Sequence, residues 1–355
     1  MNKTDYNEIY ARRRRVGSAD TLKLLLMPFV MFVFFGFPTA AGGYIQTLSN
    51  FAAPAFFILS GFFILTPDDA VRRKRLKKAI KRNFITFTAM FIVYFLINAA
   101  YLSYLGVNWA PEILRKRILF NFLVFNVWPL SIGGGIWFMQ SLLFAVIILL
   151  AADICKLLKK PYVYIPVFLI LVCVTLFSGE FSRLAGFPHF GYNYIPAGTV
   201  TRALPYMLIG MFIRYKANTI LNINRWLFPV LFAVGFLLAA AELNLLAHFK
   251  LLIYTGHTVG FAIMAISACC FALSLTDTRD SFLTSHGRSF AKRIYVCCQP
   301  VYFIMMFTVS YVLPEYYFVI RAFSPFIVLT ICLIIAYVTG VVKFALSEMK
   351  KLDNQ

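Results

Sequence analysis

Charged residues are scarce in this chain of 355 residues, and that scarcity decides its broad class. Asp, Glu, Lys and Arg together make up 14% of the sequence, whereas hydrophobic residues make up 61%. A typical soluble domain has about a quarter charged residues and about half apolar ones. The composition therefore excludes an ordinary water-soluble protein and predicts that much of the surface contacts hydrocarbon.

Acidic residues are especially few: 14 Asp and Glu stand against 34 Lys and Arg, which gives a net charge of +20. A nucleic-acid-binding protein would also be basic, but here the cations cluster in short loops between apolar runs. Loops of this kind are typically retained in the cytoplasm. We therefore expect no nucleic-acid partner, and we expect the basic face to contact anionic membrane lipid.

Histidine and the common nucleotide-binding motifs are also rare or missing. The chain has 4 His, and it contains no Walker motif, no dinucleotide fingerprint and no His-Glu-x-x-His sequence. Its 7 Cys lie in or beside apolar runs. The doublets Cys269-Cys270 and Cys297-Cys298 have no third ligand nearby, so they indicate buried small residues rather than a metal site. We expect no metal and no bound cofactor.

Apolar runs that could cross a bilayer are abundant. A membrane helix needs about 20 mostly apolar residues, and ten segments approach that criterion. Segment 113–130, with Arg115-Lys116-Arg117 ahead of an apolar stretch, is instead typical of an amphipathic helix at the membrane interface. The ten predicted spans are 22–37, 48–66, 84–105, 137–155, 161–178, 198–213, 226–244, 251–275, 294–312 and 322–346.

The basic residues predict how these spans are oriented. With the N-terminus in the cytoplasm, 27 of the 34 Lys and Arg lie in cytoplasmic segments. We therefore expect an all-α, polytopic membrane protein with both termini cytoplasmic, in the cell membrane, such as the bacterial inner or plasma membrane. A single membrane domain would cover 1–355, with an N-terminal segment 1–21, a ten-helix bundle over 22–346 and a tail 347–355.

Four segments, in order along the chain, carry a resemblance to a known family. They are 53–64, which contains Phe56-Phe57-Ile58-Leu59-Ser60-Gly61, the basic run 72–82, the segment Gly135-Ile136-Trp137-Phe138, and 287–295. Together they resemble the acyltransferase-3 family of membrane acyltransferases, which includes O-acetyltransferases of bacterial surface polysaccharides. The resemblance implies transfer of an acyl group such as acetyl from a cytoplasmic acyl-CoA. The acceptor would be a hydroxyl of an envelope carbohydrate or a lipid-linked glycan.

Two departures from the family pattern bear on catalysis. The family's first span has a basic residue followed eleven positions later by a His, the expected base, but here Lys23 is followed by Phe34. In the ninth span, where the family commonly has a second His, the chain reads Tyr295-Val296-Cys297-Cys298-Gln299. A proton acceptor contributes typically 10²–10⁴ in rate, and Phe and Gln cannot supply one.

These departures leave two hypotheses open. The chain is either an active acyltransferase or a non-catalytic relative that binds or helps export a glycan or lipid. A secondary transporter is a third hypothesis, but the chain has no evident internal repeat of the kind that many transporters use.

His257 and Glu242 are the candidate catalytic residues. His257 is expected about two turns inside the eighth span, and a titratable group at that depth is a functional candidate; the competing interpretation is a hydrogen-bonded structural histidine. Glu242, Glu180 and Arg202 are expected on the same outer side. With His257 they would form an external polar cavity.

The remaining candidates are substrate-binding residues. The resemblance implies that Lys23, Lys78, Lys81 and Arg82 contact the phosphates of acyl-CoA. The competing interpretations are a snorkelling anchor for Lys23 and a purely topological role for the basic run. Two further candidates complete the set, Trp137, for which interfacial anchoring is the simpler explanation, and Gln299.

Overall fold

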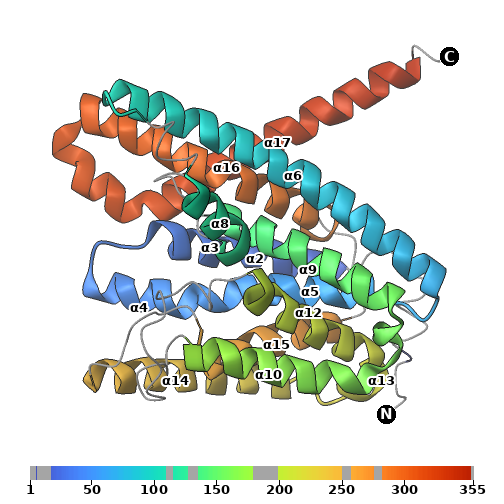
Figure 1. Cartoon of the computed structure of the whole chain (residues 1–355). Helices are drawn as coiled ribbons and strands as arrows, with labels where there is room; N and C mark the ends of the chain where they lie inside the picture. The colour runs from blue at the N-terminus through green and yellow to red at the C-terminus, as the bar shows by residue number, and fades with distance from the viewer. Residues whose placement is uncertain are drawn as a thin grey trace.

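The computed structural model describes residue 5 and residues 17–108, 115–126, 135–178, 199–249, 257–275 and 282–352. Within these ranges every regular element is a helix. The helices lie side by side as a bundle (Figure 1). They are α2 (Gly17–Leu25), α3 (Met27–Phe35), α4 (Ala40–Leu48), η1 (Ser49–Phe51), α5 (Ala52–Ile64), α6 (Asp69–Tyr104), α8 (Lys116–Phe125), α9 (Ile136–Ile154), η2 (Leu157–Lys159), η3 (Pro161–Val163), α10 (Tyr164–Ser178), α12 (Thr199–Tyr215), α13 (Ala217–Ile220), α14 (Leu227–His248), α15 (Val259–Ser274), α16 (Phe282–Val312), η4 (Pro314–Tyr316) and α17 (Tyr317–Leu352).

Seven helices of the described chain are long and apolar enough to cross a membrane. Two shorter apolar helices, Pro161–Phe177 and Val259–Ser274, overlap further predicted spans. The predicted span 198–213 corresponds to α12, which carries Arg202 and Arg214. The chain is thus an all-α polytopic membrane protein, while the span count of ten and the side of the two termini stay predictions.

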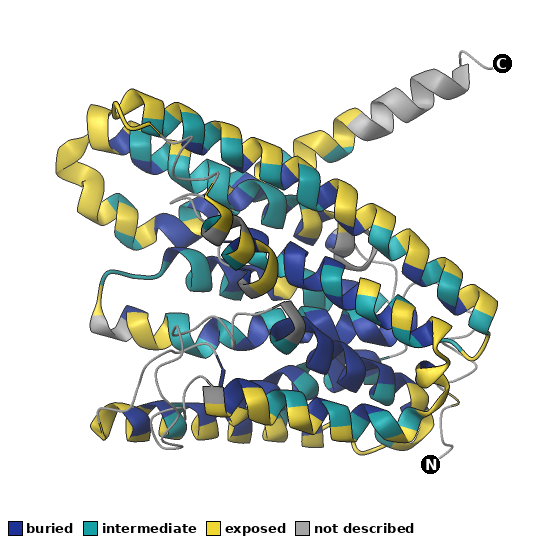
Figure 2. Cartoon of the chain, viewed as in Figure 1, coloured by how far each residue is buried: buried dark blue, intermediate teal, exposed yellow. Residues whose placement is uncertain are grey.

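The centre of the bundle is the contact between α5 and α12, where buried residues are concentrated (Figure 2). A Cβ atom on Gly61 would lie 2.0 Å from the Met207 carbonyl oxygen, and one on Gly210 would lie 2.0 Å from the Ile58 carbonyl oxygen. Small residues allow membrane helices to approach this closely. Gly61 therefore serves helix packing, and the hydroxyl of the adjacent Ser60 donates to the Phe56 carbonyl oxygen at 2.8 Å.

The helix α6 is longer than a bilayer requires. Its 36 residues correspond to about 54 Å, whereas the hydrocarbon core is about 30 Å thick. The helix begins at Asp69, where the Asp68 side chain accepts from the backbone N–H groups of Ala70 and Val71. The basic run 72–82, expected to be a loop, is therefore helical; hydropathy marks only the apolar continuation of the same helix.

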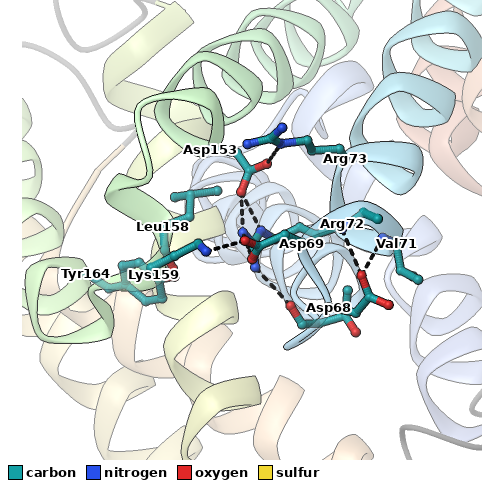
Figure 3. A network of polar contacts seen from close by, with 11 residues as sticks. Asp68, Asp69, Val71, Arg72, Arg73, Asp153, Leu158, Lys159 and Tyr164 are labelled. Carbon is teal, nitrogen blue, oxygen red and sulfur yellow. Dashed lines mark hydrogen bonds and ion pairs between the residues drawn. The ribbon is translucent and has the colours of Figure 1, made fainter.

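A buried carboxylate holds the first turns of α6 against α9 (Figure 3). Asp153 is fully buried, and it accepts from Arg72 Nε at 2.6 Å and from Arg73 Nε at 2.9 Å. Arg72 is itself buried and also donates to Asp69 at 2.7 Å. Lys159 forms a further ion pair with Asp69. Arg72 and Arg73 of the basic run thus hold α6 against α9.

The end of the bundle that contains the Arg72–Asp153 pair is called the basic end. The C-terminal part of α12 lies at this end, because the Arg214 guanidinium carbon is 5.8 Å from the ring centroid of Phe62, near the end of α5. Arg75 Nη1 donates to the Phe63 carbonyl oxygen at 3.1 Å. The ends of α5, α9 and α12 and the start of α6 therefore meet here.

The opposite end is called the Trp137 end. Trp137 precedes Asp153 by sixteen positions in α9, which places it about 24 Å away along the helix. Arg202 precedes Arg214 by twelve positions in α12, a rise of about 18 Å. Both helices thus extend from the basic end toward a region that contains Trp137 and Arg202.

His257 also lies at the Trp137 end, but outside the helix that was expected to contain it. The helix α2 lies at the basic end, because the ammonium nitrogen of its Lys23 is 5.1 Å from the ring centroid of Phe63. The carbonyl oxygen of Leu275, the first residue after α15, accepts from Ser18 Oγ of α2 at 3.0 Å, so α15 also ends at the basic end. The helix begins after Thr258, whose side chain accepts from the Phe261 N–H at 3.2 Å. The predicted span 251–275 begins earlier because hydropathy does not register this N-cap; residues 251–256 lie outside the described ranges.

Candidate active site

A cavity of about 1870 Å³ connects the basic end with the Trp137 end. Its lining comes from α2, α3, α5, α6, α9, α12 and α16, and it reaches His257 ahead of α15. The described helices therefore surround one continuous space rather than a fully packed interior.

Cations dominate the lining at the basic end. Among the described residues, Asp20 is the carboxylate that lines the cavity. It forms a salt bridge of 2.7 Å with Lys23. Every other charged side chain in this part of the lining is a cation, so the potential there is strongly positive. The lining cations are Lys23, Lys74, Arg75, Lys78, Arg82, Arg214 and Lys292.

The predicted phosphate-binding residues of α6 differ in whether they line the cavity. Lys78 and Arg82 are four positions apart, which puts them on the same face of the helix, and both line the cavity. Lys77 and Lys81 are exposed and do not line it. Of the three candidates in the basic run, the structure therefore brings Lys78 and Arg82 to the cavity and leaves Lys81 outside its lining.

Lys23 lies at the basic end, where neighbouring side chains hold it, and its contact with phosphates stays a prediction. Its ammonium nitrogen is bonded to Asp20 and lies 5.1 Å from the ring centroid of Phe63. It also lines the cavity. The side chain is thus held by neighbours at the basic end while its charge contributes to the positive lining.

Aromatic rings form the middle of the cavity wall. The ring centroids of Phe34 and Tyr295 are 6.2 Å apart, and those of Tyr295 and Phe138 are 5.3 Å apart. Phe138 stacks on Phe57 at 4.6 Å, and Phe57 contacts Trp137 edge to face at 6.5 Å. These rings form a contiguous apolar wall between the cationic lining of the basic end and the Trp137 end.

Phe34 and Gln299, which mark the two departures from the family pattern, lie together in this wall. A Cβ atom on Gly135 would lie 2.9 Å from Phe34 Cζ and 3.0 Å from Gln299 Nε2, so both side chains approach the start of α9. Both line the cavity. Neither supplies a group that can accept a proton from an alcohol at neutral pH.

Arg202, Trp137, Tyr206 and His257 line the cavity at the Trp137 end. The guanidinium carbon of Arg202 is 4.2 Å from the Trp137 ring centroid, a cation–π contact. Both Arg202 and His257 are buried, with 8% of each residue exposed. Tyr206 follows Arg202 by one turn of α12 and is also buried. A buried cation, an imidazole and a phenol thus face one space.

The two glutamates expected here are placed differently. Glu242 does not line the cavity; its Oε2 accepts from the Gly260 N–H at 3.1 Å and thereby caps the start of α15. Glu180 lies in 179–198, outside the described residues. Of the four residues predicted to form an external polar cavity, Arg202 and His257 therefore share one.

Sequence reasoning missed several lining residues, namely Lys74, Arg75, Tyr206, Arg214 and Lys292. The helical periodicity of the run 71–86 would have identified those on α6. Tyr206, Arg214 and Lys292 depend on contacts between distant helices. Within the described ranges, no group of three His, Cys, Asp or Glu lies close enough together to hold a metal ion.

A bundle of apolar helices around one cavity that extends between its two ends defines a membrane protein with a large internal site. Comparison with protein families agrees with this class: the model described as an acyltransferase domain matches residues 17–345. The chain belongs to the acyltransferase-3 family of membrane acyltransferases. Neither the curated proteins nor the solved structures contain a match to it.

Proposed function

We propose that this membrane acyltransferase moves an acetyl-like acyl group from acyl-CoA, bound at the basic end, to a carbohydrate hydroxyl at the Trp137 end. The acceptor is an envelope carbohydrate or a lipid-linked glycan, and the protein resides in the cell membrane. The continuous cavity carries the proposal, because such an enzyme must bring a cytoplasmic donor to an external acceptor.

The cationic lining of the basic end supports acyl-CoA as the donor. Coenzyme A carries several phosphate charges, and hydrogen bonds between Lys or Arg and phosphate are among the stronger ones in proteins. Lys78 and Arg82 face the cavity from one side, and Lys23, Arg214 and Lys292 face it from α2, α12 and α16. The aromatic section beyond them accommodates the uncharged thioester arm.

His257 is the proposed base. Its imidazole accepts the proton of the acceptor hydroxyl while that oxygen attacks the thioester carbonyl carbon. The carbon–sulfur bond then breaks, and the imidazolium returns the proton to the leaving thiolate. His248 lies at the end of α14, where its ring contacts that of Phe249. Of His248 and His257, it is His257 that lines the cavity.

Purified protein in nanodiscs with radiolabelled acetyl-CoA and an envelope glycan extract tests the proposal. Lys78→Gln should raise the KM for acetyl-CoA about tenfold, the effect of losing a charge-assisted hydrogen bond, and leave kcat nearly unchanged. Lys77→Gln, one position away on another face, is the matched control. His257→Gln should lower kcat by about 10²–10⁴ with little change in acetyl-CoA binding.

The position of Phe34 and Gln299 in the cavity wall favours a second candidate, a non-catalytic relative that binds or helps export a glycan or lipid. The same experiment separates the two. Acetyl-CoA binding without acyl product, and no effect of His257→Gln on envelope acylation in cells, would support the binding role. The absence of both binding and product would refute the acyltransferase proposal.

A further inference from the structure

Gln299 is a polar side chain in the aromatic middle section of the cavity. It follows Tyr295 by four positions in α16, so both side chains lie on one face of the helix, and both line the cavity. Among the residues that the structure describes, none forms a hydrogen bond with the side-chain amide of Gln299. An amide in apolar surroundings needs a hydrogen-bond partner, and an amide that faces a cavity can obtain that partner from a bound ligand.

Pro300 determines how the backbone beside Gln299 is bonded. It lies inside α16, and because proline has no N–H, the Val296 carbonyl oxygen four positions earlier loses its helical donor. The Tyr94 hydroxyl of α6 donates to that oxygen at 3.2 Å instead. Membrane helices tolerate prolines where a neighbouring helix supplies such a partner. The turn of α16 that carries Gln299 is therefore attached to α6 by a specific hydrogen bond.

The start of α9 holds the same turn from another side. The Tyr295 hydroxyl donates to the Gly135 carbonyl oxygen. A Cβ atom on Gly135 would lie 3.0 Å from Gln299 Nε2, so the glycine leaves room for the amide. Gly135 precedes Trp137 by two positions, which places the amide where the aromatic wall reaches the Trp137 end. Gln299 thus lies between the proposed donor site and the proposed acceptor site.

We propose that Gln299 Nε2 donates to the carbonyl oxygen of the acyl thioester and stabilises the negative charge that develops there during acyl transfer. This inference rests on the proposed function for the identity of the donor. The Tyr295 phenol is bonded to Gly135, whereas the Gln299 amide faces the cavity. A side-chain amide cannot serve as the base, but a rigidly positioned amide is a typical hydrogen-bond donor to such an oxyanion.

The step balances with His257 as the base. The acceptor hydroxyl oxygen bonds to the thioester carbonyl carbon, its proton passes to His257, and the carbonyl π electrons move to the oxygen that Gln299 Nε2 contacts. The C=O bond then re-forms, the carbon–sulfur bond breaks, and the leaving thiolate takes the proton from His257. The N–H of Gln299 stays on its nitrogen throughout. Because Gln299 acts on the transition state rather than on donor binding, its loss should appear in kcat.

Kinetics of the purified protein in nanodiscs, with acetyl-CoA and the envelope glycan extract, test the catalytic role. Gln299→Met, which keeps the length of the side chain without its N–H groups, should lower kcat about 10²–10³-fold, the effect of losing one oxyanion donor. The KM for acetyl-CoA should stay unchanged. Gln299→Asn, which retains an amide on a shorter side chain, should keep part of the rate and guards against misfolding of the Met variant.

Tyr302→Phe is the matched control. Tyr302 lines the cavity three positions further along α16, and its ring stacks on Phe35 at 4.3 Å. The variant removes a hydroxyl from the same lining and retains the stacked ring, so kcat should stay close to that of the wild type. An equal fall in kcat in Tyr302→Phe and Gln299→Met would contradict a specific contact with Gln299.

The infrared spectrum of bound acetyl-CoA, labelled with carbon-13 at the acetyl carbonyl, tests the contact without turnover. A hydrogen bond lowers the stretching frequency of a C=O group, so the band should lie lower in the wild type and in Tyr302→Phe than in Gln299→Met. The same band in the wild type and in Gln299→Met, or an unchanged kcat, would overturn the inference even if acyl product forms. A Gln299-dependent band without product would support the contact and overturn the acyl transfer, and a failure to bind acetyl-CoA would overturn both.

Discussion

Gly61, like Gly210, is a residue at which the contact between α5 and α12 leaves no room for a side chain. A Cβ atom there would lie 2.0 Å from the Met207 carbonyl oxygen, and the neighbour is backbone that no rotamer change can move. Gly61→Ala should therefore separate α5 from α12 and lower stability by about 1–3 kcal/mol or more, as overpacking does. Thermal unfolding in detergent, followed by fluorescence, measures the loss as a lower Tm.

Gly43 in α4 provides the matched control, because a Cβ atom there would meet no atom within 4 Å. Gly43→Ala should leave Tm unchanged or raise it, since an alanine restricts the unfolded chain and typically contributes about 0.4–1 kcal/mol. Equal Tm values for the Gly61 and Gly43 variants would contradict the close approach of α5 and α12.

At the residue scale the sequence predicted chemical types better than positions. It singled out His257 and Arg202, which line one cavity, but it grouped Glu242 with them, although that side chain caps α15. The difference is physical: whether a carboxylate faces a cavity or a neighbouring N–H depends on how α14 packs against α15. No local pattern of residues carries that information.

At the element scale, the first turns of α6 depend on Asp153. Asp153→Asn would leave Arg72, which is 3% exposed, with one fewer carboxylate partner in the protein interior. Removing one partner of a buried ion pair typically costs about 3–5 kcal/mol. We expect a clear fall in Tm and weaker acetyl-CoA binding, because the cationic face of α6 is no longer held in place.

Asp68→Asn is the control for that variant. Asp68 is exposed and caps the same helix, and Asn is an equally good N-cap residue. Its Tm should therefore stay close to that of the wild type. If Asp153→Asn behaved like Asp68→Asn in both Tm and acetyl-CoA binding, the network in Figure 3 would not anchor α6.

The sequence predicted the apolar part of each helix more readily than its polar extension. The predicted span 84–105 matches the second half of α6, yet the helix already begins at Asp69. Hydropathy detects residues that enter hydrocarbon, and the first turns of α6 carry cations instead. Reading 71–86 with a helical period would have placed Lys78 and Arg82 on one face, but it would not have separated Lys81, three positions from Lys78, from them.

At the scale of the whole molecule, the cavity was the property that the sequence could not provide. Its lining combines residues as far apart in the chain as Lys23, Arg214 and Gln299. Periodicity shows which face of a helix is apolar, but not which faces leave a space between them. The family resemblance supplied the expectation of two substrates, and the cavity extends between the two ends at which we propose that they bind.

The uneven distribution of Lys and Arg between the two ends of the bundle predicts its orientation in the membrane. The basic end should face the cytoplasm, because cationic segments next to spans are retained there. Cys155 reports on this end: it follows α9 directly after Asp153 and Ile154, and it is an exposed free cysteine. A membrane-impermeant maleimide should label it only after the cells are permeabilised. Cys173, exposed within the apolar helix α10, is replaced by Ser throughout.

Val107, just after α6 and 45% exposed, marks the other end. In a chain with Cys155→Ser and Cys173→Ser, Val107→Cys should react with the same maleimide in intact cells, because we expect the far end of α6 to meet external water. Labelling of Cys155 in intact cells, and of Val107→Cys only after permeabilisation, would place the basic end outside the cell. Acyl-CoA, a cytoplasmic molecule, could not then reach Lys78 and Arg82, so this one measurement decides whether the direction proposed for acyl transfer is physically possible.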